Sequence, residues 1–127
     1  MENKYSIILG NLGNTCDRFC KSYKTNPSSE RMLELAAENM PYIGGVELVG
    51  TWDIRPDNAK EMKKRLDGYG LECASIIPDT FGDSDYGKGS VSSTDPAVRR
   101  KALDYLRSMC EVALQVDCRI VNLWMAQ

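Results

Sequence analysis

Histidine is absent from this sequence. Because the ordinary pKa of histidine lies closest to neutral pH, the chain lacks the usual general base and cannot form a Ser-His or Cys-His catalytic pair. The same absence removes a common zinc ligand. Any catalysis by this chain would have to use carboxylates, lysine, tyrosine, cysteine or a bound metal.

Cysteine occurs in an odd number, which does not fit a scaffold held together by disulfides. The five are Cys16, Cys20, Cys73, Cys110 and Cys118. In a chain rich in regular structure we expect free thiols. Cys16 and Cys20 have a C-x-x-x-C spacing that resembles a metal motif, but a four-ligand zinc site needs a second pair of cysteines or histidines. We therefore interpret both as ordinary loop or helix cysteines.

Long hydrophobic runs and a strong charge of one sign are also lacking. No stretch approaches the roughly 20 apolar residues of a membrane span, and residues 1–10 lack the layout of a signal peptide. The formal net charge is -2, with 16 basic residues scattered among 18 acidic ones. Such a balance gives no overall attraction to nucleic acid or to an anionic membrane. We expect a cytoplasmic protein whose partners are small molecules or proteins.

Four segments have the composition of buried strands, and an amphipathic helix pattern follows each of the first three. The strand segments are residues 5–9, 44–50, 71–78 and 118–124. They mix Val, Ile, Leu and Cys with few polar breaks, which is typical of parallel strands covered by helices. The sequence therefore predicts an α/β fold built from successive βα units.

The expected helices have clear start and stop signals. Ser28 or Ser29 can cap the first helix, which stops before Pro41. A helix start after Pro56 and Asp57 leads to a stop at Gly70, a residue suited to the left-handed end of a helix. Asp95 followed by Pro96 is a strong start for the third helix, which extends to about Val116.

Right-handed βαβ connections leave two main architectures, an open doubly wound sheet or a (β/α)8 barrel. The pattern alone does not choose between them. An open sheet of four strands with no helix after the last would leave one face of that strand bare. We therefore expect further βα units beyond this sequence.

Four stretches follow one another between Gly44 and Gln127: GGVELVGTWDI, LDGYGLECASIIPD, FGDSDYGKGSVSSTDPAVRRKAL and CRIVNLWMAQ. In this order they resemble the first half of the xylose isomerase-like TIM barrel family of sugar and sugar-phosphate isomerases and epimerases. No single stretch is a signature, and it is their combination that carries the likeness. The resemblance implies that residues 1–127 are the N-terminal half of one TIM (β/α)8 barrel domain, a partial barrel with its first four strands.

The resemblance also implies a chemistry. Family members hold a divalent metal, Mn, Mg, Co or Zn, with carboxylates and a histidine at the C-terminal mouth of the barrel. The metal promotes proton or hydride movement between adjacent carbons of an open-chain sugar or sugar phosphate. The ligands come mainly from later strands, so we expect this chain alone to bind no metal and to be inactive. No catalytic residue can be assigned on this basis.

Two interpretations remain open from the residues. In the first the chain is half of a sugar isomerase or epimerase, and its unpaired sheet edges lead to a homo-oligomer or to swapped self-association. In the second it is a small, self-contained open-sheet α/β module that binds or regulates without catalysis. Light scattering after size-exclusion chromatography separates them, because only the second predicts a monomer that unfolds cooperatively.

Candidate substrate-binding residues lie near the ends of the expected strands, where barrel enzymes bind their ligands. Glu47 could orient a substrate hydroxyl from inside the second strand, or could simply pair with a neighbouring lysine or arginine. Trp52 and Trp124 could each stack on a sugar, although packing explains a tryptophan equally well. Gln127 could hydrogen-bond hydroxyls with its amide.

The loop after the third expected strand supplies the remaining candidates. Asp79 opens this loop and is a further candidate for substrate binding. Phe81, Tyr86 and Lys88 lie between glycines, as in a lid that closes over a substrate, with Lys88 able to meet a phosphate. The alternative is a solvated loop whose aspartates cap turns. The residues around Lys88 do not have the spacing of a P-loop.

Overall fold

The computed structural model describes residues 4–13, 25 and 27–124. Cys16, Cys20 and Gln127, which the sequence raised as candidates, lie outside the described residues. None of the helices in the described part of the chain is both long and apolar enough to cross a bilayer.

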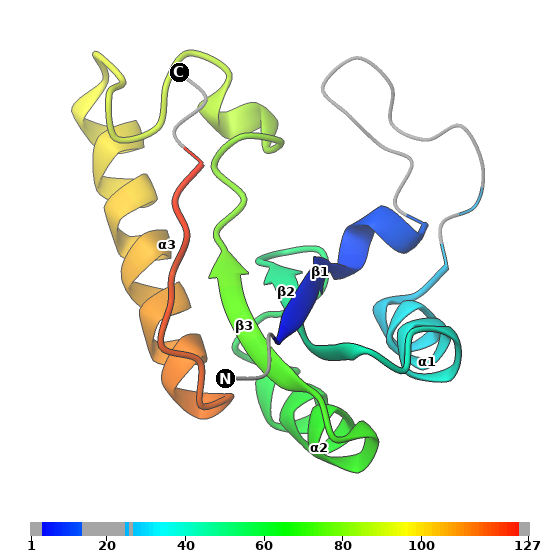
Figure 1. The fold of residues 1–127 in the computed structure, drawn as a ribbon. Helices are drawn as coiled ribbons and strands as arrows, with labels where there is room; N and C mark the ends of the chain where they lie inside the picture. The colour runs from blue at the N-terminus through cyan, green and yellow to red at the C-terminus, as the bar shows by residue number, and fades with distance from the viewer. Residues whose placement is uncertain (1–3, 14–24, 26, 125–127) are drawn as a thin grey trace.

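The described chain folds as a parallel sheet with helices, which confirms the expected α/β class. The sheet has the order β1 (Tyr5–Ile8), β2 (Ile43–Val49), β3 (Glu72–Ile77), and it is not closed. The helices are α1 (Ser29–Asn39), α2 (Ala59–Tyr69) and α3 (Pro96–Gln115), and the short turns are η1 (Leu9–Leu12) and η2 (Ser84–Tyr86). Figure 1 shows the helices in chain order around the sheet, as in part of a barrel.

The hydrophobic core lies between one face of the sheet and the helices. Leu33 of α1, Leu66 of α2 and Met109 of α3 share a buried cluster with Leu48 of β2 and Ile76 of β3. Because side chains alternate along a strand, the neighbours of these strand residues point to the opposite face. That opposite face corresponds to the interior of a barrel.

The helix ends follow the sequence signals. The Ser28 hydroxyl accepts a hydrogen bond from Arg31 N (3.2 Å), and the Asp95 carboxylate accepts one from Ala97 N (2.8 Å). Gly70 ends α2 in the left-handed conformation at φ +67°, where the missing Cβ avoids strain. The start of α2 at Ala59 likewise follows the loop that contains Pro56 and Asp57, as the sequence predicted.

The fourth expected strand is shorter than the sequence predicts. Residues 118–124 make one isolated parallel bridge to β3, between Val121 and Ile76. Ile76 N donates to Ile120 O (3.0 Å), and Asn122 N donates to Ile76 O (2.8 Å). A parallel strand is normally held on both edges, and in the described residues this segment has a neighbour on one edge only. The segment lies beside α3 and runs in the same direction as β3 (Figure 1).

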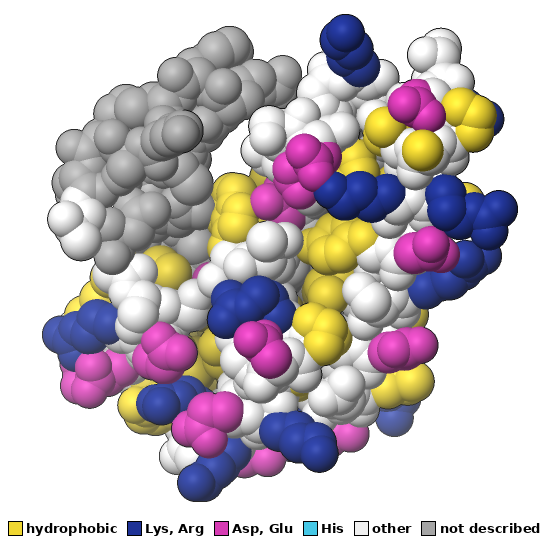
Figure 2. All heavy atoms as spheres, turned by 180° about the vertical axis from the view of Figure 1, so that it is seen from behind, with side chains coloured by type: hydrophobic (Ala, Val, Ile, Leu, Met, Phe, Trp, Pro, Cys, Tyr) yellow, Lys and Arg dark blue, Asp and Glu magenta, His cyan; other side chains and the backbone are white. Residues whose placement is uncertain are grey.

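Charged side chains of both signs are mixed over the face seen in Figure 2. Many pair along their own helix, such as Lys63 with Asp67 and Arg65 with Glu61 at i,i+4 spacing. Such exposed pairs contribute little to stability, because water and salt screen them. They support the helices and mark their solvated outer sides.

Candidate binding site at the ends of the strands

Three aromatic rings form a row at the carboxyl ends of the strands. Trp52 follows β2, Phe81 follows β3, and Trp124 closes the described segment after the bridge. The Trp52 and Phe81 ring centroids lie 5.7 Å apart in an edge arrangement, and those of Phe81 and Trp124 lie 5.1 Å apart with the planes tilted by 39°. Trp124 remains 39% exposed. The row is therefore an apolar surface with one ring open to solvent.

Asp79 lies buried behind this aromatic row. Its Oδ1 accepts a hydrogen bond from Gly82 N (2.8 Å). Burial raises the pKa of Asp79, and hydrogen bonding by Gly82 N and the Trp52 side chain partly opposes that rise. A Cβ at position 82 would lie 2.9 Å from Asp79 Oδ1 and 3.2 Å from Trp52 Cζ2. Glycine at position 82 thus permits the carboxylate and the indole to approach each other.

Glu47 lies on the barrel-interior face of β2, between core residues Val46 and Leu48 in the sequence. Its Oε2 accepts a hydrogen bond from the Ser75 hydroxyl (2.7 Å). The sequence suggested a lysine or arginine as the alternative partner, and the observed partner is this hydroxyl of β3. The half-buried carboxylate thus has a fixed direction in the sheet.

The expected lid residues lie in different environments. Phe81 belongs to the aromatic row, whereas Tyr86 is buried in η2 with Lys101 Nζ 5.8 Å from its ring centroid. Lys88 is exposed. Burial also raises the pKa of Tyr86. In this loop, Phe81 therefore lies at the candidate site, Tyr86 is buried in η2, and Lys88 is exposed to solvent.

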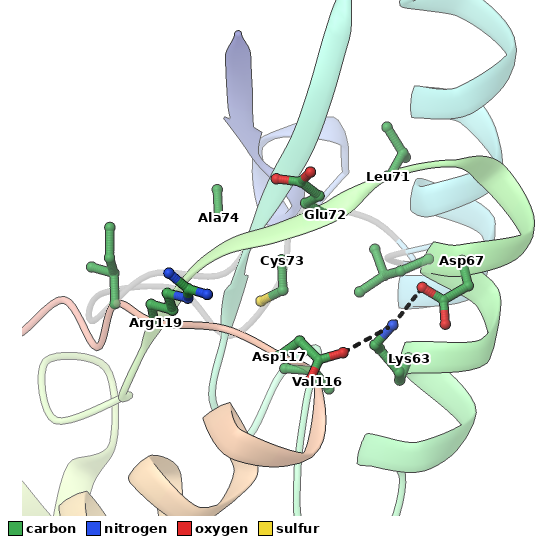
Figure 3. Close-up of a pocket in the computed structure, with 11 residues that line it drawn as sticks. Lys63, Asp67, Leu71, Glu72, Cys73, Ala74, Val116, Asp117 and Arg119 are labelled. Atoms are coloured by element: carbon green, nitrogen blue, oxygen red, sulfur yellow. Dashed lines mark hydrogen bonds and ion pairs between the residues drawn. The ribbon is translucent and has the colours of Figure 1, made fainter.

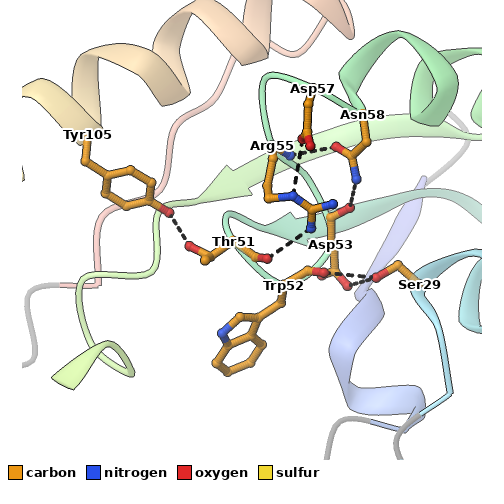
Figure 4. A network of polar contacts seen from close by, with 8 residues as sticks. All are labelled: Ser29, Thr51, Trp52, Asp53, Arg55, Asp57, Asn58 and Tyr105. Atoms are coloured by element: carbon orange, nitrogen blue, oxygen red, sulfur yellow. Dashed lines mark hydrogen bonds and ion pairs between the residues drawn. The ribbon is translucent and has the colours of Figure 1, made fainter. Parts of the chain in front are cut away.

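Tyr105 joins the two loops that carry Trp52 and Asp79, a role that was not predicted from the sequence. Its hydroxyl accepts a hydrogen bond from Asp79 N (3.0 Å) and lies 3.0 Å from Thr51 Oγ1. Figure 4 shows Tyr105 reaching from α3 to the Thr51 side chain. The side chain therefore connects the ends of β2 and β3 from the helical side.

Thr51 has a strained backbone next to Trp52. Its φ is +73°, in the left-handed region that β-branched residues rarely adopt. The strain, of about 1–3 kcal/mol, requires compensating contacts. Thr51 N donates to Ile54 O (3.1 Å), and the Arg55 guanidinium donates to Thr51 O (3.3 Å). These contacts hold the backbone of Thr51 and so determine the position from which the Trp52 side chain extends.

Asp53 ties the same loop to the start of α1. It is 1% exposed, and it accepts hydrogen bonds from Ser29 Oγ at Oδ1 (2.8 Å) and from Val49 N at Oδ2 (2.9 Å) (Figure 4). Burial raises the pKa of Asp53, because desolvation outweighs these two hydrogen bonds. The ionised carboxylate is therefore less stable here than in water.

Asp53→Asn is expected to remove a pH-dependent loss of stability. A carboxyl whose folded pKa exceeds its ordinary value of about 3.9 binds more protons in the native state, so wild-type stability falls as pH rises from about 3.9 through the folded pKa. Asparagine fits, because its oxygen can accept from Val49 N and its amide can donate to Ser29 Oγ. Urea unfolding at several pH values should show that the free energy of unfolding of Asp53→Asn rises relative to that of the wild type as pH rises.

The control for this prediction is Asp104→Asn. Asp104 is exposed and pairs with Arg107 at 2.9 Å, and its replacement leaves the buried Asp53 in place, so the loss of stability that Asp53 causes as pH rises should remain. Parallel stability curves for the wild type and Asp53→Asn across this range would contradict the assigned role of Asp53.

Carboxylates and thiols do not gather into a metal centre among the described residues. No group of three or more His, Cys, Asp or Glu side chains that could hold a metal ion occurs there. Asp53 and Asp79 each accept hydrogen bonds from backbone N–H groups. Both carboxylates are buried and hydrogen-bonded within the protein.

Comparison with known proteins identifies a protein family that the chain matches. A family model described as "Xylose isomerase-like TIM barrel" matches residues 33–127. The match begins inside α1 and includes every residue of the aromatic row and Asp79. Comparison with curated protein sequences gave no match.

Proposed function

Because the chain belongs to the xylose isomerase-like TIM barrel family, we propose that it supplies part of the sugar-binding mouth of an isomerase or epimerase. Membership in the family suggests a sugar isomerase/epimerase-type domain. The finer proposal is that the ligand is an open-chain sugar or sugar phosphate, and that Trp52, Phe81, Trp124 and Asp79 meet it.

The aromatic row carries this proposal. In barrel enzymes the ligand binds at the carboxyl ends of the strands, where Trp52, Phe81 and Trp124 meet. An indole or phenyl face is suited to the apolar C–H side of a sugar, and nearby polar groups then set its orientation. Asp79 and Glu47 are carboxylates held in fixed directions by Gly82 N and the Ser75 hydroxyl.

The divalent metal that the family implies has no fitting ligand set in the described residues. The sequence has no histidine, and no cluster of three ligating side chains occurs in the part of the chain that the structure describes. We therefore assign this chain sugar binding and orientation, and no catalytic step through a metal. Lys88, exposed in the β3–α3 loop, is available to a substrate phosphate.

Tryptophan fluorescence tests the proposal directly, because Trp52 and Trp124 are the two tryptophans of the sequence. Titration with aldoses, ketoses and their phosphates should give a saturable change in emission for at least one sugar. Trp52→Phe and Trp124→Phe each leave one indole and show which position responds. Trp52→Leu or Trp124→Leu should weaken binding about tenfold, because a stacking face of roughly 1.4 kcal/mol is lost.

Tyr42→Leu is the matched control. Tyr42 is 72% exposed at the start of β2, at the opposite end of the strands from the aromatic row. This variant should bind the sugar as the wild type does. Emission that changes only linearly with sugar, or equally in every variant, would remove the basis of the proposal.

A further inference from the structure

Cys73 and Cys118 lie on neighbouring segments at the amino end of β3, away from the aromatic row. The bridge between Ile76 and Val121 sets the parallel register, and three residues earlier on each segment are Cys73 and Cys118. Both cysteines are buried, at 9% and 5% exposure, and both belong to the main hydrophobic cluster. They hold equivalent positions on the two paired segments, and each shifts the pKa of the other. Two thiols from distant parts of the sequence thus meet inside the core.

The surroundings favour a reduced pair that can lose one proton. In the thiol form, Cys73 Sγ donates to Ser75 O (3.6 Å) and Cys118 Sγ donates to Ile120 O (3.3 Å). When Cys118 is ionised, the Cys73 thiol can donate to it, which lowers the pKa of Cys118. The same contact, together with burial, raises the pKa of Cys73. The pair therefore yields one thiolate, the reactive form of cysteine.

A cavity of about 530 Å³ gives a small molecule access to Cys73. Figure 3 shows the Cys73 side chain pointing from β3 toward the segment after α3, with Lys63 and Arg119 along the walls. Lys63 also pairs with Asp117 (3.3 Å) at the rim. Cavities of this size are typical of small-ligand sites, and the charged walls of this one mix Lys63 and Arg119 with Asp67, Glu72 and Asp117.

We propose that Cys73 and Cys118 form a redox-active dithiol that closes into a disulfide by exchange with a low-molecular-weight disulfide entering this cavity. Cys73, which lines the cavity, attacks one sulfur of the external disulfide as its proton passes to the Cys118 thiolate, forming a mixed disulfide on Cys73 and releasing one external thiolate. The second protein thiol then loses its proton and attacks the protein-bound sulfur, which expels the second external thiolate. Two protein thiols are oxidised, one external disulfide is reduced to two thiols, and the protons go to these products.

Closure of this bond would join residues 118–124 covalently to β3. In the reduced form the single bridge at Val121 holds this segment to the sheet. The disulfide adds a link between Cys73 and Cys118, positions far apart in the sequence, and so restricts the unfolded chain. The oxidised protein should therefore unfold at a higher denaturant concentration than the reduced protein.

Peptide mapping of the full chain tests the inference. The protein is equilibrated with oxidised and reduced glutathione, the remaining thiols are alkylated, and trypsin releases residues 66–88 and 108–119. A linked pair of these two peptides, two hydrogens lighter than their sum and lost on reduction, is the expected product. The second peptide also contains Cys110, which is exposed. Cys110→Ser should therefore keep the linked pair, and Cys118→Ser should abolish it.

Two outcomes would overturn the proposal. One is a linked pair that disappears in Cys110→Ser, because the exposed cysteine would then be the partner. The other is wild-type protein in which Cys73 and Cys118 remain alkylated as free thiols, or carry only glutathione, across the redox series. Both readouts are taken on folded protein with the two buried cysteines intact, so they do not depend on a variant that fails to fold.

Discussion

Gly45→Ala is expected to lower the free energy of unfolding by about 3 kcal/mol. A Cβ at position 45 would lie 2.6 Å from the backbone oxygen of Glu72, the residue opposite Gly45 in the pairing of β2 with β3. Backbone oxygen cannot turn aside as a flexible side chain can, so the two strands must move apart. Urea unfolding followed by circular dichroism measures the loss.

The adjacent residue provides a matched control in the same strand. A Cβ at Gly44 would meet only the Lys4 side chain, at 3.7 Å, which is an ordinary contact. Gly44→Ala should therefore be neutral or should stabilise the protein by about 0.4–1 kcal/mol through a less flexible unfolded chain. Equal unfolding free energies for the two alanine variants would show that the approach of Glu72 to Gly45 has no energetic role.

The local elements could be predicted because short-range chemistry determines them. The Ser28 and Asp95 caps and the left-handed Gly70 depend on hydrogen bonds and backbone angles within a few residues. The alternation of apolar strands with amphipathic helices likewise predicted the parallel sheet. These features do not require knowledge of which distant segments meet.

Features that depend on which distant segments pair were harder to predict from the sequence. Residues 118–124 have the composition of a buried strand, yet the described structure pairs them with β3 at Val121 alone. Composition indicates that a segment can enter a sheet, whereas the extent of pairing depends on its neighbours. The start of α2 at Ala59, by contrast, has a local cause, because Asn58 Oδ1 accepts from Arg55 N (2.7 Å) and holds a turn before the helix.

The candidate site likewise combines residues that could be predicted from the sequence with contacts that could not. Trp52, Phe81, Trp124 and Asp79 could be proposed individually from their places at strand ends. Their mutual contacts depend on loop paths that no spacing rule provides. Tyr105 could have been noticed as a polar aromatic residue between Ala102 and Met109 on the buried stripe of α3, and its hydroxyl needs a partner there. The positive φ of Thr51 has no sequence signal, because threonine rarely adopts it.

Tyr105→Phe is expected to lower the free energy of unfolding by about 2 kcal/mol. The phenyl ring keeps the packing of the tyrosine, so the loss comes from two polar groups. Asp79 N loses its acceptor, and the Thr51 hydroxyl loses its contact with the strained loop. Since Tyr105 joins the two loops, hydrogen exchange should also become faster at Asp79 and Gly82, which lie behind the aromatic row.

Tyr69→Phe removes a tyrosine hydroxyl from α2, where the side chain is 43% exposed, and should change stability by no more than about 0.5 kcal/mol. If Tyr105→Phe behaved like this control, the two loops would hold their positions without the hydroxyl. If Tyr105→Phe lowered stability but left exchange at Asp79 unchanged, Tyr105 would contribute to packing alone. Faster exchange together with weaker sugar binding would identify Tyr105 as a positioning residue, because its hydroxyl contacts Thr51 Oγ1 and Asp79 N in the loops that carry Trp52 and Asp79.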